Sequence, residues 1–252
     1  MKLKFTLIAA VLFAMVSLQQ AHSQSPVFLG LQGGIGIPNL HTGSTSSEVS
    51  SGYSSRLGPY FGIFGEFRLG PEFSIQPEIN YSSQGGKKNG EQAIPAQQFN
   101  PSAPPDMYVY ANYNSVAKLN YVEVPVLAKF TFPLNSHFNL LVDAGPYVGF
   151  LFKAENVTSD SSNIYLDKGE TTPVPGVGKQ NFNRSNNIKD QLKSTNFGIQ
   201  GGIGFSYNLN NGYLFIHGGG NYGLVDIQKN TQDGKNNTGA ATVTVGYALR
   251  IN

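Results

Sequence analysis

Apolar and polar residues alternate along eight stretches of the chain, clearly in seven of them. Between 120 and 132, for example, Val122 and Val124 fall on one parity, whereas Glu123 and Lys129 fall on the other. A repeat of two is the period of a β-strand, whose successive side chains point to opposite faces. The pattern predicts strands at 28–37, 59–69, 72–82, 120–132, 138–152, 195–207 and 241–251, and a less clear one at 213–227.

The connections between these stretches alternate in length. Short segments at 70–71, 133–137 and 208–212 predict tight turns, the last of them rich in Asn and Gly. The longer connections are 38–58, 83–115, 153–191 and 228–240. Long loops at one end and short turns at the other are typical of small outer-membrane barrels. The sequence therefore predicts an all-β fold, an eight-stranded antiparallel transmembrane β-barrel with four longer extracellular loops and short periplasmic turns.

A soluble, lipocalin-like barrel is the alternative, with its apolar face inside. Most of the predicted strands run to 11–15 residues, against about 5–6 in ordinary globular sheets. The polar parity is rich in Gly, which suits a narrow lumen. Aromatic residues end the apolar parity, as in the interfacial girdles of membrane barrels. These features favour the membrane barrel.

The N-terminus has the features of a secretory signal peptide. Lys2 and Lys4 precede an apolar run at 5–18, and small residues mark a cleavage site after residue 23. A membrane-anchoring helix is the alternative, but the run is short for the roughly 20 residues that such a helix needs. We therefore expect a signal peptide at 1–23, a barrel domain at 24–252, and export through the periplasm to the bacterial cell outer membrane.

Composition narrows the choice of partners. Removing both lysines of the signal peptide leaves 15 basic and 15 acidic residues, so nucleic-acid binding has no electrostatic support. The chain contains no Cys, which excludes disulfides and thiolate metal sites. The expected partners are outer-membrane lipid, periplasmic chaperones and the barrel-assembly machinery, with a possible secretion or surface partner at the loops.

Seven charged residues fall on the lumen-facing parity of the predicted strands. Because an isolated buried charge is very costly, we expect them to be paired and hydrogen-bonded as an internal plug. A proton relay or a narrow pore is the alternative. The expected network consists of Glu66, Arg68, Glu78, Glu123, Lys129, Asp143 and Arg250, with Glu123 and Lys129 neutralised by Arg68, Arg250, Asp143 or Glu78.

Pro125 is the exception within its strand. Proline lacks the N–H that a paired strand donates, and every strand of a closed barrel is paired on both sides. We expect a local bulge or kink at Pro125 that faces the lumen.

The remaining motifs give weaker indications. Glycine-rich segments at 30–37 and 198–205 resemble nucleotide loops, but no helix follows, so lumen-lining glycines are favoured. His41, His137 and His217 could serve a catalytic triad. Acidic residues of the third long loop, Asp160, Asp167 and Glu170, could bind calcium, and Tyr108, Tyr110 and Tyr113 could bind a partner or extend a strand. We expect no metal, no cofactor and no catalytic residue.

Several segments together resemble a known family. They are "LNYVEVPVLAKFTF" (119–132), "DAGPYVGFLF" (143–152), "NFGIQGGIGFSY" (196–207), "NYGLVDI" (221–227) and "VTVGYALRIN" (243–252). This combination resembles the PorT-type outer-membrane β-barrel family of Bacteroidota. The resemblance implies an eight-stranded outer-membrane barrel and a shared proline at position 125, but it does not imply one activity, and the family's namesake serves protein secretion.

The expected role is non-enzymatic: membrane structure, surface interaction or support of protein secretion. Two alternatives stay open at this point. One is an outer-membrane enzyme that modifies lipid or peptide, and the other is a small pore.

Overall fold

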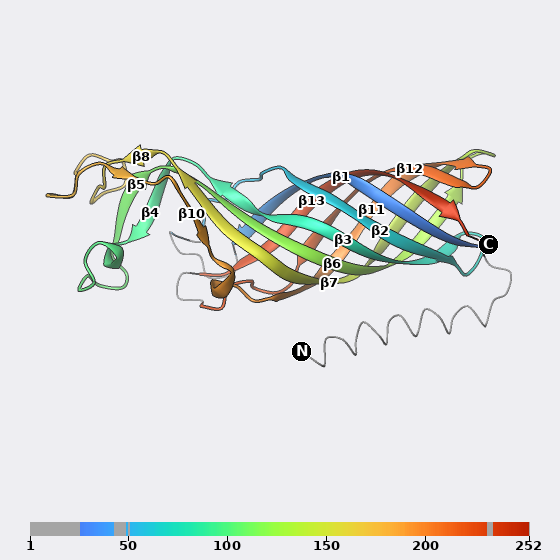
Figure 1. Ribbon diagram of the computed structural model, residues 1–252, viewed down its shortest axis with the longest axis horizontal. Coiled ribbons are helices and arrows are strands. Elements are labelled where there is room, and N and C mark those ends of the chain that lie inside the picture. The colour runs from blue at the N-terminus through green and yellow to red at the C-terminus, as the bar shows by residue number, and fades with distance from the viewer. Residues whose placement is uncertain (1–25, 43–48, 50, 231–233, 252) are drawn as a thin grey trace.

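The computed structural model describes residues 26–42, 49, 51–230 and 234–251. The expected signal peptide at 1–23 lies outside these residues. Eight strands form one closed antiparallel ring, in which β6 pairs with β7 and β13 pairs with β1 (Figure 1). The ring comprises β1 (Val27–Thr42), β2 (Gly58–Arg68), β3 (Phe73–Lys88), β6 (Asn114–Pro133), β7 (Phe138–Ser159), β11 (Thr195–Leu209), β12 (Gly212–Gly223) and β13 (Asn236–Arg250).

All eight predicted stretches lie within these strands for most of their length, which confirms the barrel. The ambiguous stretch at 213–227 forms β12, which ends at Gly223. Tyr213 and Asn221 of β12 are buried in the lumen, whereas Leu214 and Ile216 are exposed. The pattern of this strand was ambiguous because aromatic and glycine residues occupy both of its faces.

The barrel carries its apolar side chains on the outside. Leu31 and Val245 are 61% and 59% exposed, whereas Glu66 and Ala248 are completely buried. A soluble barrel would have the opposite arrangement, because apolar area in contact with water is unfavourable. The exposed band is the lipid-facing surface of a membrane barrel. Among the described residues, no helix combines the length and the apolar character needed to cross a membrane.

Three short connections close one end of the barrel. They join β2 to β3, β6 to β7 and β11 to β12. The first and last strands of the barrel also meet at this end, since the N–H of Ile251 donates to the carbonyl of Val27 and that of Arg250 donates to the carbonyl of Asn211. This is the periplasmic end, as the connection lengths predicted.

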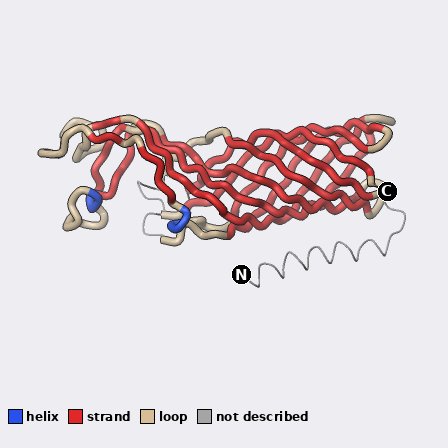
Figure 2. Tube along the Cα trace, viewed as in Figure 1, coloured by secondary structure: helices blue, strands red, loops and turns tan. Residues whose placement is uncertain are grey.

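At the opposite end, β6 and β7 are much longer than a membrane strand requires. The 22 residues of β7 span about 73 Å at ~3.3 Å per residue, whereas crossing a bilayer takes about 9–11 residues. The excess length carries an extracellular lobe, seen as the bent arm in Figure 2. The lobe contains β4 (Glu91–Pro95), η1 (Ala96–Gln98), β5 (Tyr108–Asn112), β8 (Ser161–Ser162), β9 (Gln180–Asn181) and β10 (Arg184–Asn187). The short helix η2 (Lys189–Gln191) follows at the mouth of the barrel.

The lobe has an apolar core of its own. Ile94, Val109, Ile164 and Phe182 are buried together, and the ring of Tyr113 stacks on Phe182 at 4.3 Å between centroids. The segments 83–115 and 153–191 were predicted as loops, but β3, β6 and β7 extend into them. The further strands that they contain are only two to five residues long, too short to show a clear period. The tyrosine-rich segment at 106–113 is therefore a strand of a separate hairpin, paired with β4, and not an extension of β6.

Of the bulge or kink expected at Pro125, the bulge is wrong and the kink stays a prediction. The register of β6 against β3 is the same at Val126 and at Glu123, so no residue is inserted, although pairing lapses for two residues at the proline. The missing N–H of Pro125 accounts for this lapse. The register shift lies instead between Asn120 and Tyr121, in the pairing with β7.

Candidate functional site

The lumen contains a buried ion cluster centred on Glu66. The carboxylate of Glu66 lies 2.8 Å from Nζ of Lys129 and 2.9 Å from Nε of Arg68. The Lys129 ammonium also donates to Oε1 of Gln76 and to the hydroxyl of Tyr213, both at 2.9 Å. Tyr213 in turn donates to Glu66. All three N–H donors of Lys129 therefore have a partner, as a buried ammonium requires.

The structure brings Glu66, Arg68 and Lys129 together, as expected. It pairs Lys129 with Glu66, however, and not with Asp143 or Glu78. Asp143 is the cross-strand neighbour of Lys129 by register, yet the long lysine side chain reaches the Glu66 carboxylate on β2. The alternation of residues located the charges on the lumen face but could not tell which of them would meet.

Glu78 is held by neutral amides in place of a cation. Its carboxylate accepts from Gln76 at 2.6 Å, Asn80 at 2.7 Å and Gln32 at 3.0 Å. Asn80 also donates to the hydroxyl of Tyr60 at 2.7 Å, which links β2 to β3. Amide N–H groups can thus satisfy a buried carboxyl oxygen without an ion pair.

Glu123 has the same kind of environment. Gln84 donates to Glu123 at 3.2 Å and Asn221 donates at 3.1 Å. The expected neutralisation of Glu123 by Arg68 or Arg250 is therefore wrong. Arg250 is exposed at the last residue of β13, away from this part of the lumen. The amide partners lie on the same parity as the charges, which is the signal that could have identified them.

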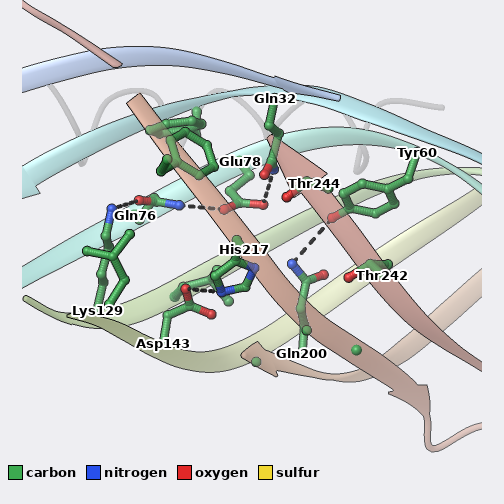
Figure 3. Close-up of a pocket in the computed structure, with 17 residues that line it drawn as sticks. Gln32, Tyr60, Gln76, Glu78, Lys129, Asp143, Gln200, His217, Thr242 and Thr244 are labelled. Atoms are coloured by element: carbon green, nitrogen blue, oxygen red, sulfur yellow. Dashed lines mark hydrogen bonds and ion pairs between the residues drawn. The ribbon is translucent and has the colours of Figure 1, made fainter. Parts of the chain in front are cut away.

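A small cavity separates the Glu78 cluster from Asp143 and His217 (Figure 3). Its volume is about 20 Å³, enough for a single water molecule, which needs about 10–15 Å³. Nε2 of His217 lies 2.9 Å from Oδ2 of Asp143, but the contact lacks hydrogen-bond geometry. Gln200 and Thr244 also direct side-chain oxygens without a described partner toward this region. The two side chains thus lie in contact inside the lumen without forming a hydrogen bond.

Apolar layers cover both ends of the polar lumen. On the periplasmic side, Phe28, Phe64, Tyr213 and Ala248 pack together, with Phe215 against them. On the extracellular side the layer consists of Leu40, Ala117, Leu119, Tyr121, Leu151, Ala154, Leu192 and Ile227. Leu192 and Ile227 come from extracellular loops, so these loops fold over the mouth of the barrel. The polar part of the lumen lies between these two layers, and a hollow of about 570 Å³ borders the extracellular one.

The acidic loop residues are engaged in local contacts. The carboxylate of Asp167 accepts from the hydroxyl and backbone N–H of Thr171 and from the N–H of Thr172. These hydrogen bonds, those of Thr171 first, lower the pKa of Asp167. Asp160 accepts from Nδ2 of Asn114. No three His, Asp or Glu side chains lie together in the described ranges as a metal ion would require.

The extracellular lobe contains a cleft of about 740 Å³ between the lobe hairpin and the extensions of β7 and β10. We call it the lobe cleft. Its volume falls in the range of about 300–1,000 Å³ that is usual for ligand sites. It is lined by Val49, Ala93, Ile94, Pro95, Gln98, Phe99, Tyr113, Asn156, Thr158, Gln180, Phe182, Arg184, Asn186, Asn187, Ile188 and Gln191.

A closed ring of eight tilted strands, apolar outside and polar inside, defines the chain as an outer-membrane β-barrel. The family model described as outer membrane protein beta-barrel domain matches residues 19–229, and the chain belongs to this family. The match ends before β13, which the structure nevertheless places in the ring between β12 and β1.

Solved barrels resemble this fold at low sequence identity. Neisserial surface protein A is 11% identical, with a TM-score of 0.46, over 89% of this chain and 97% of its own. OprG from Pseudomonas aeruginosa is 10% identical, with a TM-score of 0.43, over 90% and 97%. The protease OmpT from Escherichia coli is 10% identical, with a TM-score of 0.29, over 90% and 96%. At TM-scores below 0.5 these similarities carry no functional information. No curated protein matches the chain.

Proposed function

We propose that this protein is a non-enzymatic outer-membrane barrel that acts through its extracellular lobe, in surface interaction or in support of protein secretion. The main support is a contrast between the two parts of the molecule: polar and apolar side chains occupy the lumen, whereas the extracellular end carries a lobe with its own apolar core. The resemblance to PorT-type barrels, whose namesake serves secretion, agrees with this role. The proposal includes cleavage of a signal peptide after residue 23, assembly by periplasmic chaperones and the barrel-assembly machinery, and a partner held at the loops.

A conducting pore has less support. An open channel needs a continuous polar path, but apolar layers cover the lumen at both ends. Between them, the Lys129 cluster and the amide-held Glu78 and Glu123 fill the cross-section. The filled lumen favours an internal plug that stabilises the barrel.

An enzyme that modifies lipid or peptide also has less support. His217 contacts Asp143, but this pair lies inside the lumen, and no serine is among the described residues that line its cavity. A serine triad needs that third group within hydrogen-bond reach. His41 is exposed near the end of β1, with its ring 5.6 Å from that of Tyr222, and the serine-rich loop after it lies outside the described residues.

Two measurements test this proposal. In planar bilayers, the purified protein should give no stepwise conductance, and discrete channel openings would support the pore instead. In living cells, a photo-crosslinking amino acid at Phe99, which is 42% exposed in the lobe, should capture a surface or secreted macromolecule. The same group at Leu134, in a periplasmic turn, is the matched control. Equal patterns at both positions, or none at Phe99, would contradict a role of the lobe.

A further inference from the structure

The lobe cleft lies beside an unpaired strand edge. Three consecutive residues of β4 line the cleft: Ala93, Ile94 and Pro95. Because successive side chains point to opposite faces of a strand, the edge of β4 borders the cleft and not one of its faces. Among the strands that the structure describes, β4 pairs only with β5, on one side. In Figure 1, β4 and β10 hang from the arm next to each other, and the cleft contacts both.

The alternation of hydrogen-bonded and non-hydrogen-bonded residue pairs along the hairpin shows which backbone groups of β4 point away from β5. Ala93 is opposite Tyr110 in the register of the hairpin. The N–H and carbonyl of Tyr110 bond with Tyr165, on the side away from β4, at 2.8 Å each. In an antiparallel pair, the backbone N–H and C=O groups of two opposite residues either both point toward the partner strand or both point away from it. The N–H and carbonyl of Ala93 therefore face away from β5, and no described residue bonds to them.

The opposite wall of the lobe cleft is also an edge. Of the described strands, only β7 pairs with β10. The bond from the Ile188 N–H to the carbonyl of Ala154, at 3.1 Å, shows which residues of β10 bond to β7. By the same alternation, the backbone groups of Asn187 face away from β7. Asn187 lines the cleft. Two strand edges thus border one hollow, although they belong to different sheets.

The lining indicates the chemistry of the occupant. Arg184 is the only charged side chain among the described lining residues, so an anionic or strongly basic ligand finds little complementary charge. Phe99, Tyr113 and Phe182 provide apolar surface, while amides such as Gln98 and Asn186 can both donate and accept. An extended, uncharged peptide matches this combination, because its backbone needs donors and acceptors and its alternate side chains need apolar contacts.

We propose that the lobe cleft binds an extended, uncharged peptide segment of a partner protein, which adds as a strand to the free edge of β4 at Ala93. This inference rests on the proposed role of the lobe in partner binding and specifies its mode. Strand addition takes its affinity from main-chain hydrogen bonds and its specificity from alternate side-chain contacts. It also covers an edge that is otherwise open to unwanted pairing.

A matched pair of variants tests the main-chain contact. Ala93→Pro removes the outward N–H but no bond of the hairpin, and proline is tolerated on an edge strand, so the lobe should still fold. Ala93→Gly keeps the N–H. The probe is an array of uncharged ten-residue peptides, screened against the full-length protein in detergent micelles, with heat-dependent gel mobility as the folding check. An array of neutral oligosaccharides tests the rival ligand class.

The expected result is a set of peptides that bind the wild type and Ala93→Gly alike. Their affinity should fall at least tenfold with Ala93→Pro, about 1.4 kcal/mol. N-methylation at alternate peptide residues should cause a similar loss, and this readout needs no variant protein. Equal binding to Ala93→Pro, binding of oligosaccharides alone, or no binding peptide would overturn the proposal. Persistent cross-linking at Phe99 in those cases would leave the lobe's role intact and reject only strand addition.

Discussion

Replacement of Lys129 by methionine tests whether the lumen network holds the barrel together. Lys129 is buried and gives its three donors to Glu66, Gln76 and Tyr213. Methionine keeps most of the side-chain volume but removes the charge and all three hydrogen bonds. Glu66 then retains Arg68 and the Tyr213 hydroxyl, while the carboxyl oxygen that faced Lys129 loses its ion pair.

The size of the effect follows from burial. Removing one member of a buried ion pair costs about 3–5 kcal/mol, because the other charge stays buried. Glu66 has no exposed side-chain surface, but Arg68, which is 27% exposed, remains 2.9 Å away. The lower end of the range, about 3 kcal/mol, is therefore expected. With a urea dependence of ~2 kcal/mol per molar, the midpoint of unfolding should fall by about 1.5 M.

The assay is a urea titration in lipid vesicles. Unfolding is followed by intrinsic tyrosine fluorescence, since the chain contains no Trp, and by the gel mobility of unboiled samples. Lys153→Met is the control, since its ion pair with Glu155 is 54% exposed on the lysine side. Its midpoint should move by less than about 0.5 M, because exposed pairs contribute at most about 1 kcal/mol. The double variant Lys129→Met/Glu66→Gln should recover most of the loss. An unchanged midpoint for Lys129→Met would refute the stabilising role of the cluster.

Two further predictions concern other parts of the chain. Gly34→Ala should destabilise the barrel by about 1–3 kcal/mol, because a Cβ there would lie 2.0 Å from the carbonyl oxygen of Val243. Gly33→Ala should be tolerated, because a Cβ there would lie 3.9 Å from its nearest neighbour, and the urea midpoints of the two variants test the difference. Thr171→Val should raise the lowered pKa of Asp167 toward its ordinary value. In the wild type, the loop contacts of Asp167 should be lost only as pH falls through that lowered pKa, as carboxyl-detected NMR titration would show.

The barrel could be predicted because its signal is local. Each membrane strand places one face in lipid and the other in the lumen, so residues only two positions apart report their surroundings. The alternation around Glu123 and Lys129 was enough to place both in the lumen. In β12, Tyr213 and Phe215 place aromatic side chains on the lumen face, so the alternation of apolar and polar residues is weaker in this strand.

The pairings inside the lumen could not be predicted in the same way. They depend on how eight strands are staggered, which a local pattern does not contain. Lys129 and Glu66 are 63 positions apart, and Gln84 and Asn221 are 137 apart. The expectation that acids pair with bases also neglected the neutral amides, whose N–H groups donate to the carboxylates of Glu78 and Glu123 in place of a cation. The lobe was missed because its strands are too short to establish a period.

The length of β6 and β7 connects the barrel to the proposed partner site. The lobe core is small, with three alanines among its seven buried apolar residues, too little to fold alone by the usual scale of hydrophobic stabilisation. It is held because β6 and β7 leave the barrel already paired and continue their ladder to Asn114 and Ser159. The barrel wall, stabilised from inside by the Lys129 cluster, therefore fixes the position of the lobe. Held in this way, the side of β4 that pairs with no described strand lies beside the lobe cleft, where the proposed partner segment would add to it.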